Sequence, residues 1–517
     1  MADGGSGGHV DSIRQSGKSR TEQAILADSA GPSFINTLTI TSNEEGRKKV
    51  SLLPGVIRIQ YWESLLQDCV KATVTYADGG NTIEKDGKKV TAREGLPIVG
   101  SETVDIKVTD NNKNTLILKM LVNKPAEIFT ESTKSLVRLD MAAMEYFTNE
   151  KVRIKTRMDG KISDHVRKIL KEDEKYLATE EHIYIEPTSN NYNFIGNNKK
   201  PFWTLNWLAK RAVPDGGSGG SSGSPKGNTA GYLFYAAGKT YYFRSIESLM
   251  GQEQKISVIY TQSPDEQGEK IPEGYDVKAL TYAVEDRLKV KDKMSTGYAE
   301  TRLKVFDAFN CKYVKQEDKA ADIEKKDGIT TAGKNLPKLN PDLNRKGGEN
   351  FSKTTWCLLD RGSLPTGSGK GQDQEQLDKS KEENADPKSV TNQSIMRLNQ
   401  LFSEMVSITL PGVFSLHVGD AIYVDSPQLQ QDTGVCADQP DKFTGGKYVI
   451  CDLCHYITTE ETYTKLNLMR DSVGRKGKPT KTDGNTASIP TERLANTGTG
   501  RNGQLGTGTY GSLRPSG

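Results

Sequence analysis

The pentapeptide CDLCH, from Cys451 to His455, holds the residues of this chain best suited to chemistry. Its C-x-x-C-H spacing matches the motif that attaches haem covalently in c-type cytochromes. The surrounding residues predict a strand, however, and successive side chains of a strand point to opposite faces. Cys451 and His455 would then share one face while Cys454 lies on the other, so one haem or zinc ion could not bind all three. We expect small apolar thiols in a sheet, without cofactor or metal.

No second group of ligands completes a zinc site, which usually needs four. His417 stands alone in the sequence, and Cys436 lies in an expected loop. The remaining cysteines, Cys69, Cys311 and Cys357, are scattered without the density of a disulfide framework. We therefore expect all six cysteines to be free thiols.

A glycine-rich segment, GSGKG at Gly367 to Gly371, resembles part of a phosphate-binding loop. The complete loop needs a glycine where Leu364 stands and a serine or threonine where Gly371 stands, directly after a strand. The surrounding residues here are polar, so the segment predicts a flexible linker and no nucleotide site.

Two histidines, His165 and His182, flank a charged run from Lys168 to Glu181. No serine, cysteine or carboxylate motif places either histidine in a catalytic triad, so we expect both at the surface. The charged run predicts a solvated helix face, with a partner-binding surface as the alternative. We identify no catalytic residues and predict that the protein is not an enzyme.

The composition excludes some classes of function. The 70 Lys and Arg residues against 67 Asp and Glu leave a net charge of +3, too small a field for binding nucleic acid by neutralising phosphates. A hydrophobic fraction of 34%, a mean hydropathy of -0.62 and 50 glycines indicate ordered modules joined by polar segments. Residues 1–32 lack the apolar run of a signal peptide or membrane helix, so we expect a flexible arm on a protein kept in the cytosol.

Alternation at period two predicts a first β block over residues 33–126. Apolar residues recur at every second position, as in Val70, Ala72, Val74 and Tyr76. Several short strands separated by Gly and Asn turns indicate a small barrel or sandwich.

Residues 127–249 predict an α+β domain. Ser163 is the expected N-cap of a first helix. Pro201 opens a second helix with a strong apolar face, expected to end near Val213. The segment Gly231 to Arg244 predicts a hairpin that turns at Gly238.

A second β block is split in the sequence. Residues 250–310 begin it and residues 394–472 resume it, with clear expected strands at Tyr448 to Ile457 and Thr462 to Met469. The insertion at residues 311–393 holds few apolar side chains, so it cannot bury enough surface to offset its ordering entropy. We expect this insertion to be largely mobile.

The tail, residues 473–517, has the same polar character as the insertion. We expect it to be flexible as well.

Six segments, in their order along the chain, resemble one known family. The late segments ITLPGVFSLHVGDAIYV and GGKYVICDLCHYITTEETYTKLNLMRDS resemble the second tube-like barrel of baseplate hub proteins of T-even-like contractile-tailed phages, especially the cyanophage members. The earlier segments YWESLLQDCVKATVTYAD, GLPIVGSETVDIKVTD, PFWTLNWLAKRA and GYLFYAAGKTYYFRSIESL resemble the first barrel and the intervening domain. The family is related to the hub part of VgrG-type secretion spikes. The similarity spans roughly Ser33 to Asp471, apart from the insertion.

The resemblance implies a mainly β fold. It comprises two tube-like antiparallel β-barrel domains, the second split by a long insertion, and an intervening α+β domain. It also implies a homotrimer whose six barrels form a pseudo-sixfold ring, adapting the hexameric tail tube to the trimeric central spike and leaving a channel for DNA. His455 resembles a histidine found in this strand of hub barrels, with no catalytic role.

The implied partners are the central spike protein, the tail tube or tube-initiator protein, the tape measure protein and the surrounding baseplate wedge proteins. No specific nucleic-acid recognition and no membrane are expected. The implied location is the tail baseplate of the virion, assembled in the host cytoplasm. A tail enzyme that degrades peptidoglycan or polysaccharide is the alternative, but it would require paired carboxylates in a cleft, and no convincing pair stands out. A tail-tube or tube-initiator protein with a single barrel is less favoured because the chain has two β blocks.

Overall fold

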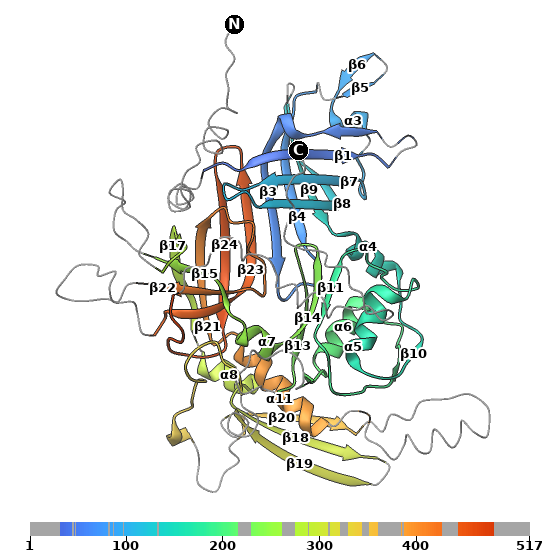
Figure 1. Ribbon diagram of the computed structural model, residues 1–517. Helices are drawn as coiled ribbons and strands as arrows, with labels where there is room; N and C mark the ends of the chain where they lie inside the picture. Colours follow the sequence, from blue (N-terminus) through green and yellow to red (C-terminus); the bar gives the residue numbers. More distant parts are fainter. Residues whose placement is uncertain are drawn as a thin grey trace, which may run out of the picture.

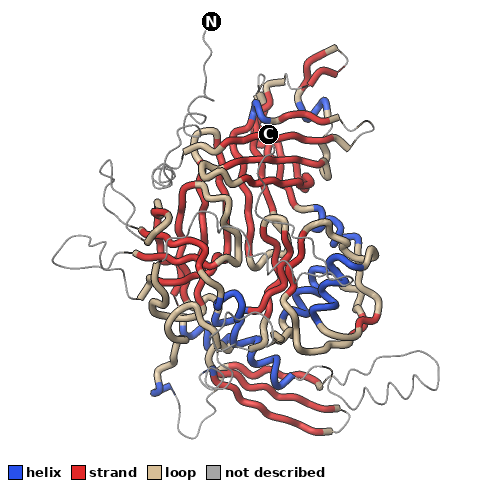
Figure 2. Tube along the Cα trace, viewed as in Figure 1, coloured by secondary structure: helices blue, strands red, loops and turns tan. Residues whose placement is uncertain are grey.

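The computed structural model shows a mainly β molecule in which antiparallel sheets dominate (Figure 1). Figure 2 shows that most helices lie in the middle and lower part of the view, while strands dominate the upper part and the lower end. The structure describes residues 31–43, 46, 48–80, 83–85, 87–96, 98–131, 134–215, 229–260, 274–287, 289–308, 311–320, 329–343, 351–359, 384, 387–426 and 443–479.

A first strand set runs in the spatial order β2-β1-β7-β8-β9-β4-β3, and every neighbouring pair in it is antiparallel. Its inward side chains, among them Leu38, Val74 and Ile106, are fully or almost fully buried, as period-two alternation predicts. The strands are β1 (Phe34–Thr41), β2 (Lys49–Ser51), β3 (Val56–Ser64), β4 (Lys71–Asp78), β7 (Thr103–Thr109), β8 (Thr115–Thr130) and β9 (Ser135–Ala142).

Short elements accompany this set. They are the 3-10 turn η1 (Leu53–Gly55), the hairpin of β5 (Ile83–Lys85) and β6 (Lys88–Val90), and the helix α3 (Ala92–Gly95). The boundary predicted at residue 126 is wrong, because β8 continues to Thr130 and β9 pairs with both β4 and β8. The strand β8 continues beyond Val122, where the alternation of buried apolar side chains stops.

A second strand set runs in the order β16-β15-β22-β23-β24-β21-β17. The expected strands at Tyr448 to Ile457 and Thr462 to Met469 are confirmed, since they lie in β23 and β24. The strands are β15 (Gln254–Ile259), β16 (Val277–Lys278), β17 (Thr281–Arg287), β21 (Glu404–Pro411), β22 (Ala421–Asp425), β23 (Gly446–Thr458) and β24 (Thr462–Arg470).

The two strand sets share one connectivity. In chain order, β1, β3, β4, β7, β8 and β9 of the first set correspond to β15, β17, β21, β22, β23 and β24 of the second. When the six strands of each set are numbered in chain order, they lie side by side in the same order in both sets: first, fourth, fifth, sixth, third and second. One pair differs in direction, because β1 runs antiparallel to β7 while β15 runs parallel to β22.

An α+β domain lies between the two sets in sequence. Pro201 begins α6 as predicted, and its inward residues Phe202, Leu205 and Leu208 are buried. The elements are α4 (Met144–Lys151), β10 (Arg157–Met158), α5 (Ile162–Arg167), the π-helical turn η2 (Lys168–Glu172), β11 (His182–Ile185), β12 (Phe194–Ile195), α6 (Pro201–Ala209), β13 (Tyr232–Ala237), β14 (Thr240–Ser245) and α7 (Ile246–Gly251).

The N-cap predicted at Ser163 is wrong. The cap is Lys161, which forms an isolated bridge with Asn191 and so brings the chain into the helix earlier. The backbone N–H of Ser163 donates instead to Thr188 Oγ1 at 3.0 Å. The second helix also ends before Val213, at Ala209.

A small sheet and two helices lie at the lower end of the molecule in Figure 1. In this sheet β18 pairs antiparallel with β19 and parallel with β20, and α11 packs on it. The elements are α8 (Val290–Thr296), β18 (Glu300–Asp307), β19 (Lys312–Lys319), the 3-10 turn η3 (Pro341–Leu343), β20 (Lys353–Leu358) and α11 (Pro387–Gln400).

This small sheet corrects two expectations. Residues 311–393 contribute β19, β20 and the first part of α11, so the described part of the insertion is ordered structure. The low apolar content of the insertion does not prevent its order, because the sheet takes its buried side chains, Leu303 and Val305, from outside the insertion. The strand β18 in turn belongs to this sheet and not to the second strand set.

The chain beyond residue 472 also begins with ordered contacts. Arg475 donates to Asp425 Oδ2 at 2.9 Å, and Lys476 donates to the Thr331 carbonyl at 2.9 Å. The expected flexibility of residues 1–30 and 480–517 lies outside the described residues.

Candidate functional site: the junction between the strand sets

The two strand sets are joined edge to edge into one sheet. The strand β3 pairs antiparallel with the second half of β23, from Ser64 opposite Asp452 to Arg58 opposite Thr458. The Leu65 N–H extends the ladder to the Cys451 carbonyl at 2.9 Å. Because β3 has β4 on its other side, the junction leaves neither edge of this strand exposed.

A buried carboxylate lies at this junction. Glu63 is 2% exposed and accepts four hydrogen bonds, which come from different parts of the chain. Its Oε1 accepts from Tyr61 Oη at 2.7 Å, from the Gly238 N–H at 2.7 Å and from His417 Nδ1 at 2.8 Å. Its Oε2 accepts from the Val418 N–H at 2.9 Å. The donors to the two oxygens thus come from the first strand set, from the β13–β14 hairpin of the α+β domain (the central hairpin) and from the second strand set.

The charges of Glu63 and His417 stabilise each other. Burial alone raises the pKa of Glu63, but the charge of His417 and the hydrogen bonds outweigh burial and bring it down to about 2. Burial lowers the pKa of His417, and the charge and hydrogen bond of Glu63 outweigh that effect and raise it. The carboxylate and imidazolium therefore form an ion pair between the strand sets at mildly acidic pH, below the raised pKa of His417.

Two glycines allow the central hairpin to approach this pair. Gly238, at the tip of the β13–β14 hairpin, has φ +57°, and a Cβ there would lie 3.1 Å from His417 Cε1. Gly419 has φ +82°, and a Cβ there would lie 2.3 Å from Tyr235 Oη. Side chains at either position would force the hairpin away from the second strand set.

The loop that carries His417 is held by a second ion pair. Asp420 Oδ2 accepts from the His417 N–H at 2.9 Å and from Lys255 Nζ at 2.8 Å. Gln252 Nε2 donates to the Gly419 carbonyl at 2.6 Å. These contacts fix the loop independently of Glu63, so the site is preorganised.

The CDLCH segment lies in β23 beside this site. His455 is buried, stacks on Tyr61 with ring centroids 6.0 Å apart, and hydrogen-bonds Thr464 Oγ1 through Nδ1 at 3.0 Å. Burial lowers its pKa to about 3, so the ring is neutral. Cys451 is buried while Cys454 is half-buried and lies opposite Trp62. In the described part of the chain no group of three or more His, Cys, Asp or Glu residues is arranged to hold a metal ion.

The other candidates from the sequence lie elsewhere. His165 is buried, not at the surface as expected, and its Nε2 lies 2.8 Å from the Tyr192 carbonyl. His182 is half-buried in β11. In the charged run, Lys171 and Glu172 are exposed as predicted, but the helix expected over the whole run ends at Glu172. The segment GSGKG and Cys436 lie outside the described residues.

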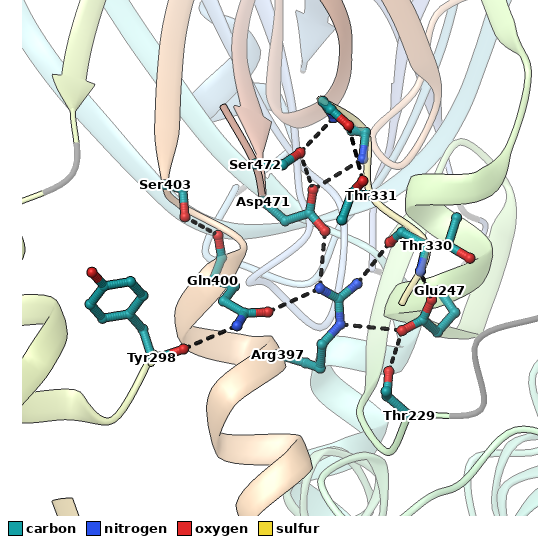
Figure 3. Close-up of polar contacts among 12 residues, drawn as sticks. Thr229, Glu247, Tyr298, Thr330, Thr331, Arg397, Gln400, Ser403, Asp471 and Ser472 are labelled. Atoms are coloured by element: carbon teal, nitrogen blue, oxygen red, sulfur yellow. Dashed lines mark hydrogen bonds and ion pairs between the residues drawn. The ribbon is translucent and has the colours of Figure 1, made fainter. Parts of the chain in front are cut away.

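Figure 3 shows a second buried network, around Arg397 of α11. Arg397 is 1% exposed and donates to Asp471 Oδ2 at 3.0 Å and to the Thr330 carbonyl at 3.1 Å. Its Nε lies 3.3 Å from Glu247 Oε1 of α7. Gln400 accepts from the same guanidinium at 3.0 Å. The network ties α11, α7 and the end of the second strand set into one body.

One cavity of about 370 Å³ lies between the end of α6, β20 and α11. Its lining includes Tyr192, Lys210, Arg211 and Leu358, and no carboxylate. A pair of carboxylates for glycoside cleavage is therefore missing from this cavity. No helix among the described residues is long and apolar enough to cross a membrane.

Sequence comparison with family models and with curated proteins gives no match. Solved structures of phage tail and secretion proteins are similar in chain trace. A tail protein from Neisseria meningitidis MC58 gives a TM-score of 0.45 at 8% identity, covering 84% of this chain and 96% of that one. The 43 kDa tail protein of prophage MuSo2 from Shewanella oneidensis gives a TM-score of 0.43 at 8% identity, and the alignment covers 84% of this chain and 98% of that one.

A component of the Escherichia coli type VI secretion system, described as similar to tail proteins of bacteriophage T4, gives a TM-score of 0.38 at 8% identity. The alignment covers 86% of this chain and 80% of that one. All three TM-scores lie below 0.5.

Proposed function

We propose that this chain is a structural hub of a contractile phage tail baseplate. Three copies form a ring of six strand sets, each set a tube-like barrel. The ring adapts a hexameric tail tube to a trimeric central spike and leaves a channel for DNA. The observation that carries the proposal is the shared connectivity of the two strand sets within one chain.

Duplication of this kind suits a symmetry adaptor. Three chains with two equivalent units each present six similar units to one neighbour while keeping three-fold symmetry toward the other. The β3–β23 junction supports the proposal because it places the two units side by side in one sheet. The two units therefore meet at an edge, as successive units of a ring must.

The charges of the site support a structural role. Glu63 accepts four hydrogen bonds, and the Arg397 guanidinium forms ion pairs with two carboxylates, so the charges of these groups are balanced inside the protein. A net charge of +3 suits a channel through which DNA slides without being held.

The proposed partners are the central spike protein on one face and the tail tube or tube-initiator protein on the other. The tape measure and baseplate wedge proteins are proposed as further neighbours. The proposed location is the virion baseplate, and no catalytic role is proposed.

Native mass spectrometry and electron microscopy of the purified chain, alone and mixed with its spike protein, test the proposal. The expected result is a trimer that appears as a ring with a central channel. A stable monomer that binds neither the spike nor the tube protein, or a ring of any other number, would overturn it.

A further inference from the structure

Among the strand edges that have no partner strand within the described residues are those of β17 and of the second half of β8. The strand β17 pairs with β21 on one side only. The strand β8 pairs with β7 up to Leu121, and from Asn123 to Thr130 it pairs with β9 alone. In Figure 1, β17 and β8 lie on opposite sides of the molecule. Unpaired N–H and C=O groups along such edges favour pairing with another chain.

The β3–β23 junction shows what these edges can bind. By the shared connectivity, β17 corresponds to β3 and β8 corresponds to β23. The strand β23 first pairs with β22, passes a bulge between Ile450 and Asp452, and then pairs with β3. The strand β8 first pairs with β7 and passes a bulge between Val122 and Lys124. Beyond this bulge, the free edge of β8 corresponds to the edge of β23 that pairs with β3.

The bulge that both strands share makes the correspondence specific to individual residues. A second bulge in β8, between Glu127 and Phe129, has no counterpart in β23 and leaves Ile128 as the extra residue. A bulge re-aims a strand and is kept as a designed feature. Following the pairings through the two sets, His455 corresponds to Glu127 and Tyr61 corresponds to Val284. His455 lies opposite Tyr61 in the junction, so Glu127 is expected opposite Val284.

The side chains of both edges suit a protein partner. Ile128 and Phe129 lie in the part of β8 that pairs with β9 alone, and they are 52% and 49% exposed. Leu280, just before β17, is 38% exposed, and Tyr282 is half-buried against the core. Large apolar side chains beside an unpaired edge are a liability for a monomer.

We propose that β17 of one copy pairs antiparallel with residues 126–130 of β8 in a second copy, continuing the sheet between chains. The inference rests on the proposed hub ring and names its interface. Val284 then lies opposite Glu127, and Ala283 lies opposite Phe129. Pro125, which has no N–H, sets the limit of the pairing on the β8 side.

This contact is head to tail, because its two halves lie on different strand sets. A heterologous contact forms a closed ring when its rotation closes, and a filament otherwise. Around the ring, β3–β23 junctions within a chain alternate with β17–β8 junctions between chains. Every barrel would then meet its neighbours through the same type of strand pairing.

Disulfide trapping tests the pairing in the full-length chain. Directly opposite residues of antiparallel strands have Cβ atoms about 4.5–5.5 Å apart, close enough for a disulfide with small adjustment. The double variant Ala283→Cys with Phe129→Cys should form covalent dimers and trimers on mild oxidation. The matched control is Ala283→Cys with Lys119→Cys, because Lys119 lies in the part of β8 that β7 already covers. The control should match the native chain, whose own thiols set the background.

A charge variant gives a second measurement. Phe129→Asp places a carboxylate on an exposed position, so the monomer should fold, while the dissociation constant of the trimer should rise at least about tenfold. A trimer that forms but shows no disulfide between the two introduced thiols, and that Phe129→Asp leaves intact, would overturn this interface and leave the hub function standing. A chain that stays monomeric even with its spike protein would overturn both.

Discussion

The Glu63–His417 ion pair makes a prediction that the structure allows to be worked out in magnitude. Replacing Glu63 with Gln keeps the shape of the side chain and removes its charge. A carboxyl whose pKa falls from 4.5 to about 2 on folding contributes about 3 kcal/mol to the free energy of unfolding at neutral pH. The NH2 group of the introduced Gln would also face one of the N–H groups from which Glu63 now accepts, so that hydrogen bond would be lost. We expect a loss of about 3 kcal/mol.

The pH dependence has a definite sign. The pKa of Glu63 is lower in the folded protein, so its contribution is present above pH 4.5 and is lost as the pH falls through about 2. The pKa of His417 is raised, so its contribution is complete below pH 6.5 and is lost as the pH rises through the folded value. Both pKa shifts report the same ion pair, so its free energy is counted only once. The junction is therefore most stable between about pH 4.5 and pH 6.5.

Hydrogen exchange is the suitable assay because a chain of several domains need not unfold in one step. The amides of Gly238 and Val418 donate to Glu63 and report the junction directly. At about pH 6, Glu63→Gln should accelerate their exchange about 100-fold if they exchange by opening of the junction. The matched control is Glu150→Gln, which removes an exposed ion pair with Lys200 and should change little. Acceleration below about fivefold, or an equal effect in the control, would refute the reasoning.

Three further predictions concern other buried groups. Arg397→Met leaves two buried carboxylates without their cation and should lower the free energy of unfolding by about 3–5 kcal/mol. The control Arg138→Met removes a largely exposed ion pair and should lower it by at most about 1 kcal/mol. Urea denaturation compares the two variants. Cys454→Ser should leave folding and assembly nearly unchanged, because the side chain is half-buried, while Cys451→Ser should destabilise the chain by about 1–3 kcal/mol in the same assay. Gly419→Ala should lower the melting temperature, because its φ is +82° and the new Cβ would clash with the central hairpin.

Each of these predictions can fail. Equal costs for the two arginine variants would show that the Arg397 network contributes little. Haem absorbance or stoichiometric zinc in the purified protein would show that CDLCH is a ligand set. For glycine, Gly79→Ala is the control, because a Cβ there would meet nothing within 4 Å. A Gly419→Ala variant as stable as that control would mean that the hairpin does not press on the loop.

Some of the site was visible in the alternation of the sequence. Ile59, Tyr61 and Glu63 stand at every second position, so a strand places the carboxylate on the buried face with the two apolar residues. That pattern could have marked Glu63 as a buried charge in need of a partner. Glu63 was not predicted as a site residue, because it is a single charge on an apolar face and belongs to no cluster of reactive residues in the sequence.

The partner of Glu63 could not be found in this way. His417 is separated from it by 354 positions, and Gly238 by 175. Local pattern carries no information about which distant loop meets a strand, since loop closure between remote segments depends on the whole packing. The same holds for Arg397, whose two carboxylates come from α7 and from Asp471, the residue directly after β24.

The sequence by itself determined the local structure: the strands with alternating apolar residues, the helix that begins at Pro201, and the hairpin that turns at Gly238. These follow from side-chain periodicity and from the backbone preferences of proline and glycine, which act over a few residues. Only the tertiary structure decided where the first strand set ends, that β18 joins β19 and β20, and that two strand sets with one connectivity meet at β3 and β23. Strand pairing is set by which edges remain free after packing, and that is a property of the whole fold.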